Sequence, residues 1–182
     1  MGQCCKAMGL GGKERYEELN NNPVVVLDKK WHGQKVKVSN FNVSGSGTAL
    51  CTAAIHQSRA FYEILVKSEG KFCVGVSQRS KALGGHLGAT KKSWGLKSHD
   101  RFKVDDIIGV AIDLDTASLR FFHNGEELVK ERIRGVRGLV YAAVSVSNGA
   151  KLDCNFSQNF KHDPGTMGVL GYDGIIPARD VL

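Results

Sequence analysis

From Val24 onward, the chain consists of short segments rich in β-branched and aromatic residues, each bounded by Gly, Asn, Asp or Ser. This rhythm is typical of strands joined by tight turns. In the clearest example, LRFFHNGEEL at Leu119–Leu128, Asn124 and Gly125 can take the positive φ angles of a type I′ turn between two strands. No segment keeps a 3.6-residue apolar period with proper caps over more than about ten residues. The sequence therefore predicts an all-β fold, a two-sheet antiparallel β-sandwich.

Two neighbouring segments test this interpretation. AFYEILV at residues 60–66 could form a helix, but its aromatic and branched side chains and the nearby Gly70 favour a strand. In the next segment, KFCVGVS at residues 71–77, large apolar residues alternate with Cys and Gly. This alternation predicts a strand that packs one face inward.

The composition fits one domain. The chain has 182 residues, of which 42% are hydrophobic and 24% charged, as in ordinary globular domains. The NNNP stretch at Asn20–Pro23 ends a Gly-containing segment, so we expect a short flexible tail over residues 1–22 and the sandwich domain over residues 23–182. The apolar runs are too short for a membrane-spanning helix. A secretory signal is not readable and the five cysteines have no disulfide spacing, so we expect a cytoplasmic protein.

Positive charge is concentrated in one part of the sequence. The formal net charge is +7, and the stretch from Arg79 to Lys103 contains a run of Lys and Arg residues opposed only by Asp100. A smaller basic group is formed by Lys29, Lys30, Lys35 and Lys37. Anionic partners, including lipid head groups, are therefore favoured.

An ordered set of segments resembles the SPRY domain family. The strongest block, DDIIGVAIDLDTASLRFFHNGEEL at Asp105–Leu128, is similar to the family's Asp-hydrophobic-Ile-Gly strand, Asp-containing bend and hairpin ending in Asn-Gly. The resemblance extends from about Val24 to Phe160. The other matching segments are FYEI at Phe61–Ile64, VGV at Val74–Val76, SWGL at Ser93–Leu96, YAAVSV at Tyr141–Val146 and LDCNF at Leu152–Phe156.

The resemblance implies a SPRY-like sandwich of concanavalin-like jelly-roll architecture, with loops at one end that bind peptides or proteins. We therefore expect a non-catalytic, monomeric protein-protein interaction module, an adaptor that binds a peptide or protein segment. From charge and loop placement, the expected contact residues are Arg79, Lys81, Lys91, Lys92, Trp94 and Arg101. The alternative is a carbohydrate or nucleic-acid binding module that uses the same basic and aromatic surface, although the alternation of the strands favours a core role for most aromatic rings. Trp31 and Trp94 lie next to turns and basic residues, and they are the rings best placed to reach a binding face.

The N-terminus carries a possible lipid anchor. Gly2 can accept myristate after removal of Met1, and Cys4 and Cys5 can accept palmitate beside it. Two such signals give the stable anchoring that one myristoyl chain lacks. Lys6 stands where the usual pattern has Ser or Thr, so an unmodified tail is the alternative. With acylation, we expect a peripheral protein of a cytoplasmic membrane face, its basic stretch near anionic lipids.

Catalytic and metal motifs are not found in the sequence. The chain lacks a CxxC pair, a GxSxG elbow and a GxxxxGKS loop, and its histidines are not clustered. Cys51, Cys73 and Cys154 lie in apolar strand segments, where a buried thiol has a raised pKa and is a poor nucleophile. Asp113 and Asp115 fit a structural bend. We therefore expect no catalytic residue, no metal and no cofactor.

Overall fold

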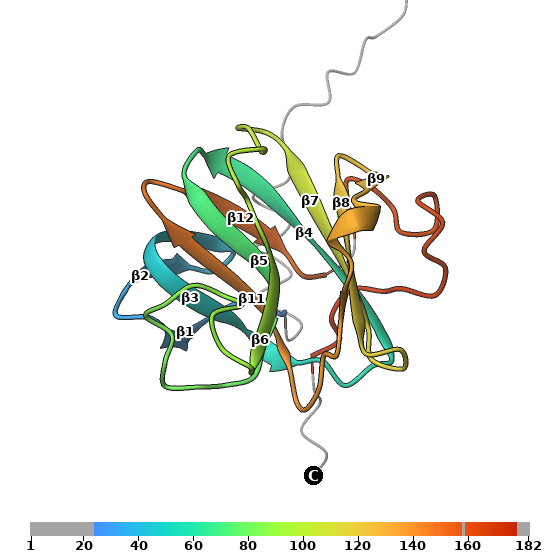
Figure 1. Cartoon of the computed structure of the whole chain (residues 1–182), viewed down its shortest axis with the longest axis horizontal. Coiled ribbons are helices and arrows are strands. Elements are labelled where there is room, and N and C mark those ends of the chain that lie inside the picture. Colours follow the sequence, from blue (N-terminus) through green and yellow to red (C-terminus); the bar gives the residue numbers. More distant parts are fainter. Residues whose placement is uncertain (1–23, 158, 178–182) are drawn as a thin grey trace, which may run out of the picture.

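The structure is a computed structural model that describes residues 24–157 and 159–177. The expected tail over residues 1–22 lies outside this range. The described part is built from antiparallel strand ladders that form one strongly curled sheet, with β10 (Ile133–Arg134) at one end of the strand order and β6 (Ser93–Lys97) at the other. The curl brings two layers face to face, as Figure 1 shows. The prediction of an all-β antiparallel sandwich is therefore confirmed.

The longest strand, β3 (Asn42–Ala54), belongs to both layers. Its first residues pair with β2 and β12, and its later residues pair with β1 and β11. Gly45 and Gly47 lie between the two parts with φ angles of 96° and 131°, which other residues rarely adopt. A Cβ atom at Gly45 would also collide with the backbone of Lys35. These glycines let one strand pass from one layer to the other.

The first layer, here called sheet A, contains the second half of β3 and four further strands. They are β1 (Leu27–His32), β5 (Lys71–Ser77), β6 (Ser93–Lys97) and β11 (Tyr141–Ser147).

The second layer, sheet B, contains the first half of β3 and seven further strands, and the short 3₁₀ turn η1 (Val129–Glu131) follows β9. The strands are β2 (Lys35–Ser39), β4 (Arg59–Ser68), β7 (Ile107–Asp113), β8 (Ser118–His123), β9 (Glu126–Glu127), β10 (Ile133–Arg134) and β12 (Lys151–Asn155). No helix in residues 24–157 and 159–177 is long and apolar enough to cross a membrane.

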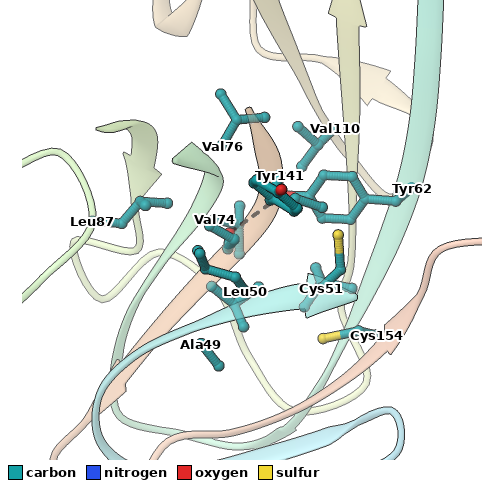
Figure 2. Close-up of a cluster of buried hydrophobic side chains, with 14 of the residues drawn as sticks. Ala49, Leu50, Cys51, Tyr62, Val74, Val76, Leu87, Val110, Tyr141 and Cys154 are labelled. Carbon is teal, nitrogen blue, oxygen red and sulfur yellow. Dashed lines mark hydrogen bonds between the residues drawn. The ribbon is translucent and has the colours of Figure 1, made fainter. Parts of the chain in front are cut away.

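The core fills the space between the layers, and Tyr62 links them. This residue is fully buried on β4, and its hydroxyl donates a hydrogen bond of 2.6 Å to the carbonyl oxygen of Gly75 on β5. Burial raises the pKa of Tyr62, so the hydroxyl stays a donor. Figure 2 shows Tyr62 among buried side chains that include Cys51, Val110 and Cys154. The same hydroxyl lies 3.4 Å from the carbonyl oxygen of Ala143 on β11, so a buried polar group fixes the two sheets at a defined place.

Sheet A is covered on its outer face as well, which corrects the one-sided pattern expected for KFCVGVS. Every residue from Phe72 to Ser77 is buried. The loop over residues 78–92 folds back across this face, where Leu83 is 6% exposed and Leu87 is 1% exposed. Thr48 holds the loop, because its backbone N–H donates to Leu83 O at 2.8 Å and its hydroxyl donates to Gly85 O at 2.8 Å. The small residues of the alternation leave room for this loop.

Sheet B is covered by the chain after β12. Phe61 and Phe122 are buried on its outer face together with Val169, and Phe160 packs edge-on to Phe61 with ring centroids 4.9 Å apart. Glu63 anchors the segment, because its carboxylate accepts the backbone N–H groups of Lys161 at 2.6 Å and His162 at 2.8 Å. Burial raises the pKa of Glu63, while these hydrogen bonds act in the opposite direction.

The predicted strands over residues 60–66 and 71–77 and the predicted hairpin are confirmed. Asn124 and Gly125 have φ angles of 49° and 88°, as a type I′ turn requires. The second strand of the hairpin, β9, has only two residues. It is short because the 3₁₀ turn η1 begins at Val129, directly after its N-cap Leu128, and turns the chain away toward β10.

Glu127 on β9 joins two arginines and gives a prediction for the pH dependence of stability. Its carboxylate accepts from Arg120 at 2.9 and 2.6 Å and from Arg132 at 2.7 Å. The hydrogen bonds from Arg120 are the main cause that lowers the pKa of Glu127 from 4.5 to about 2. Since the folded-state pKa is the lower one, this stabilisation is complete above pH 4.5 and is lost as the pH falls toward 2.

We expect Glu127→Gln to lower the free energy of unfolding at pH 6 by about 2 kcal/mol and to have a much smaller effect near pH 2. Urea unfolding of both proteins at several pH values measures this difference. Glu126→Gln, a change of the exposed neighbour, is the matched control. Equal destabilisation by Glu127→Gln at both ends of the pH range would contradict the assignment.

Candidate binding surface

Arg79 is the exposed centre of a group of polar and aromatic side chains at the end of β5, in which Tyr141 is buried and Trp31 is partly buried. Its guanidinium lies over the ring of Tyr141 at 4.5 Å and over the ring of Trp31 at 4.9 Å. The carboxylate of Asp28 is 3.6 Å from the guanidinium. Arg79 keeps 37% of its side chain exposed, whereas Asp28 keeps 15%.

Three strands bring these residues together. Tyr141 begins β11 opposite Ser77, the last residue of β5, so Arg79 follows directly beside it. Asp28 and Trp31 come from β1, which pairs with β3. Stacking on two rings holds the planar guanidinium in place while 37% of the side chain stays exposed. A ligand carboxylate or carbonyl oxygen can therefore be bound without the cost of ordering a free arginine.

The loop over residues 135–140 lies beside this group. The side-chain amide of Gln78, next to Arg79, donates a hydrogen bond of 2.7 Å to Arg137 O. Leu139, two residues before Tyr141, is 51% exposed. We define the Arg79 surface as Asp28, Trp31, Arg79, Leu139 and Tyr141. It combines a fixed cation, aromatic rings and an exposed aliphatic side chain at one end of the sandwich.

The expected contact residues do not all belong to this end. Lys81, Lys91 and Lys92 are exposed on the loop over residues 78–92, which begins with Gln78 and Arg79. Trp94 is the second residue of β6, opposite Val76, and is half-buried against the core. The structure therefore brings Arg79, both ends of this loop and Trp94 to the same end of β5 and β6.

Arg101 lies at the other end of β6, which separates it from the rest of the expected set. It follows the last residue of β6, Lys97, and its guanidinium bonds Glu131 at 2.8 Å. The guanidinium also lies 5.7 Å from the centroid of the Phe102 ring. The short distance in sequence between Trp94 and Arg101 led to their being grouped together. In the structure, β6 separates them, because the strand carries the chain across the whole sheet.

Asp28, Tyr141 and Leu139 were missed by sequence reasoning. The smaller basic group at Lys29–Lys37 drew attention to charge near β1 but not to the acidic residue that approaches Arg79. Tyr141 was assigned only to a closing strand. Pairing between β5 and β11, which are more than sixty residues apart, brings it to the site.

Three cysteines and Asp113 have structural surroundings in the described part of the chain. Cys51, Cys73 and Cys154 are buried, and burial raises the pKa of both Cys51 and Cys73 to about 12. Asp113 accepts the Thr116 backbone N–H at 2.9 Å in the bend after β7. Residues 24–157 and 159–177 contain no group of three or more His, Cys, Asp or Glu that could hold a metal ion.

Comparisons with known proteins agree with this architecture. The SPRY domain family model matches residues 97–159. SPRY domain-containing protein 7 of Homo sapiens is 26% identical over 181 residues, which cover 89% of this chain and 88% of that protein. The protein of the same name in Gallus gallus is 26% identical over 180 residues, covering 88% of this chain and 90% of that protein. The crystal structure of the TRIM65 PSpry domain has a TM-score of 0.53 at 14% sequence identity, covering 85% of this chain and 98% of that chain.

Residues 97–159 thus match the SPRY domain family, and the curled antiparallel sandwich agrees with that match. SPRY domains are commonly protein-interaction modules. Over nearly its whole length the chain is similar to SPRY domain-containing protein 7. The compact ending LDCNFSQNF at Leu152–Phe160, the GVRGLVYAAV segment and the cysteine-bearing N-terminus predicted this particular similarity.

Proposed function

We propose that this chain is a non-catalytic adaptor that binds a segment of a partner protein through the Arg79 surface. The observation that carries the proposal is the stacking of one exposed arginine on two aromatic rings beside an exposed leucine. Arginine and aromatic residues dominate the energetics of protein interfaces. The rings supply contact area at low conformational cost, and the guanidinium supplies directed hydrogen bonds.

The partner segment that fits this surface is acidic or ends in a carboxylate next to an apolar residue. Arg79 offers donors to a carboxylate, and the apolar residue would contact Leu139 and the exposed edge of Trp31. The exposed lysines of the loop over residues 78–92 add long-range attraction for such a segment. Asp28 opposes a second acidic group close to Arg79, which gives the surface some selectivity.

Arg79→Ala should weaken capture of the partner by at least about tenfold, because the removed side chain is the centre of the surface. Proteins bound by the full chain in cell extracts, and their affinities for the purified variants, measure the effect. Arg79→Lys keeps the charge but loses the stacking, so most of the loss should remain.

Arg101→Ala is the matched control, since it removes an arginine at the opposite end of β6 and should leave capture unchanged. Thermal unfolding of each variant checks that the fold is intact. Equal capture by wild type and Arg79→Ala, or a larger loss with Arg101→Ala, would contradict the proposed surface.

We further propose that acylation at Gly2, Cys4 and Cys5 tethers the adaptor to a cytoplasmic membrane face. These residues lie outside the described part of the chain, so the proposal is based on the sequence alone. Membrane fractionation and metabolic labelling with myristate and palmitate analogues test it. A Gly2→Ala, Cys4→Ser, Cys5→Ser variant should lose both labels and move to the unbound fraction. If the variant stays in the membrane fraction as the wild type does, the proposed acyl tether is wrong.

A further inference from the structure

The C-terminal end of β6 lies between two surface hollows, at the end of the strand away from the Arg79 surface. One hollow, of about 230 Å³, is formed by residues of β5, β6, the loop that covers sheet A and the turn after β6. The other, of about 240 Å³, lies between β6 and the segment that carries η1 and β10. Lys97 and His99 line both hollows. The two form one surface around the end of β6.

The first hollow gathers positive charge. Lys97 lies opposite Cys73 in the sheet, and Lys71 lies two residues earlier on β5, so both side chains are on the same outer face. Diagonal neighbours of this kind are about 7 to 8 Å apart, close enough for two long side chains to reach one anion. Neither lysine forms an ion pair with a carboxylate of residues 24–157 or 159–177.

His86 and His99 add two imidazoles to this hollow. Asp100 is the one acidic residue among the described residues that line it. Phe72 and Cys73 form a neutral floor, because burial keeps the Cys73 thiol protonated. The hollow therefore favours a compact anion that carries several acceptor oxygens.

The turn after β6 has non-glycine residues at two positions where glycine is usual. Arg101 N–H donates to Ser98 O at 3.0 Å, and the two residues between them, His99 and Asp100, have φ angles of 44° and 58°. These are the two central positions of a type I′ turn, which favour Asn and Gly. Residues held in this region of φ are costly and occur preferentially at ligand sites. The strained conformation holds His99 at the hollow.

Within residues 24–157 and 159–177, no strand pairs with β6 on the side away from β5. Gln78 N–H donates to Lys92 O and Ser98 N–H donates to Phe72 O, each at 2.9 Å. In an antiparallel pair, residues bonded to the neighbouring strand alternate with residues whose backbone groups point away from it. The bonds at residues 92 and 98 therefore leave the N–H and C=O groups of Gly95 and Lys97 pointing away from β5. Among the described strands β6 pairs only with β5, so these groups can pair with an added strand. The exposed Lys97 selects against strands that lack a negative charge at the facing position.

We propose that the C-terminal end of β6 binds an extended segment of a partner protein that carries a phosphorylated side chain. The segment pairs with the outward backbone groups of Gly95 and Lys97. Its residue opposite Lys97 points to the same face as Lys97 and Lys71, so a phosphate there enters the hollow between the two ammonium groups. A phosphate carries close to two negative charges at neutral pH and three strong acceptor oxygens, which matches two lysines and two imidazoles better than a carboxylate does.

The test uses NMR titration of the full chain, labelled with ¹⁵N, with three seven-residue peptides of alternating Thr and Val. Their central residue is phosphoserine, glutamate or serine. The phosphoserine peptide should shift the amide signals of Gly95, Lys97 and His99 and bind at least about tenfold more tightly than the serine peptide. The glutamate peptide should be intermediate. Equal binding of all three peptides, or shifts confined to other regions, would overturn the proposal.

The variant Lys71→Gln, Lys97→Gln should lose at least about tenfold in phosphopeptide affinity. Lys91→Gln, Lys92→Gln removes the same charge from the covering loop and should change the affinity by less than about twofold. A phosphopeptide that binds both double variants equally would contradict the assignment to this hollow. Arg79→Ala should leave phosphopeptide binding unchanged, so this site and the Arg79 surface can fail independently.

Phosphatidylserine vesicles distinguish a lipid head group from a protein segment. Co-sedimentation of the full chain with vesicles should be the same for wild type and Lys71→Gln, Lys97→Gln. If the double variant instead loses vesicle binding while wild type does not bind the phosphopeptide, the end of β6 recognises a membrane and the proposal is wrong.

Discussion

Replacing Gly75 by alanine should lower the free energy of unfolding by at least about 3 kcal/mol. An added Cβ atom would overlap the carbonyl oxygen of Trp94 and lie 2.6 Å from Gly95 Cα. Both are backbone atoms of β6, so the neighbouring strand would have to move as a whole. Such a shift would also disturb the carbonyl of Gly75 that accepts the Tyr62 hydroxyl. Urea unfolding followed by circular dichroism measures the loss.

Gly85→Ala is the matched control for this substitution. A Cβ atom at Gly85 meets nothing within 4 Å. The same chemical change there should alter stability by less than about 1 kcal/mol, and reduced flexibility of the unfolded chain favours a small gain. If Gly75→Ala were as stable as Gly85→Ala, the close contact between β5 and β6 would be wrong.

Replacing Leu87 by alanine should lower the free energy of unfolding by about 2 to 4 kcal/mol. Leu87 is 1% exposed and packs over Gly95, where an added Cβ would lie 2.7 Å from its Cδ2 atom. Its N–H donates to the Ser145 hydroxyl at 3.2 Å, which fixes the loop to β11. The variant leaves a cavity between the loop and sheet A.

Hydrogen exchange together with urea unfolding tests this second prediction. Exchange should accelerate for the backbone amides of residues 80–92, because the loop depends on few buried contacts of its own. Leu170→Ala makes the same change at a residue that is 75% exposed and should cost less than about 0.5 kcal/mol. A loop whose protection is unaffected in Leu87→Ala would show that it is not held by this side chain.

Local sequence signals predicted the strands well and the coverings of the sheets poorly. The positive φ angles of Asn124 and Gly125 follow from their residue types, and the strand at residues 60–66 follows from its branched and aromatic side chains. The burial of Cys73 and Gly75 does not follow from alternation. It depends on Leu83 and Leu87, which lie in a Gly-containing segment with no strand pattern and reach the sheet only through tertiary packing.

The candidate site shows the same limit. Charge and turn composition placed Arg79 at a binding surface, but Tyr141 and Asp28 reach it through strand pairings that no short motif encodes. The same reasoning grouped Arg101 with Arg79, although β6 separates them and Glu131 already binds Arg101. Distances along the chain cannot tell which end of a strand a residue occupies until the topology is known.

The two ends of β6 have different chemistry. At the Arg79 surface a stacked guanidinium lies beside aromatic and aliphatic groups. This combination suits a shape-complementary contact with a partner protein. At the other end lie Lys71 and Lys97, which form no ion pair with a carboxylate of the described residues, beside an edge of β6 that pairs with no other described strand. If both proposed sites bind segments of one partner, effective concentration would raise the overall affinity without any new contact.

Site-specific photocrosslinking tests the central claim most directly. The full chain is prepared with benzoylphenylalanine at Leu139, which is 51% exposed on the Arg79 surface, or at Leu170, which is 75% exposed on the segment that covers sheet B. Illumination in cells should give a discrete crosslinked protein from position 139, lost on Arg79→Ala, and none from position 170. Crosslinks from position 170 alone, or crosslinks from position 139 that persist in Arg79→Ala, would contradict protein recognition by this end of the sandwich.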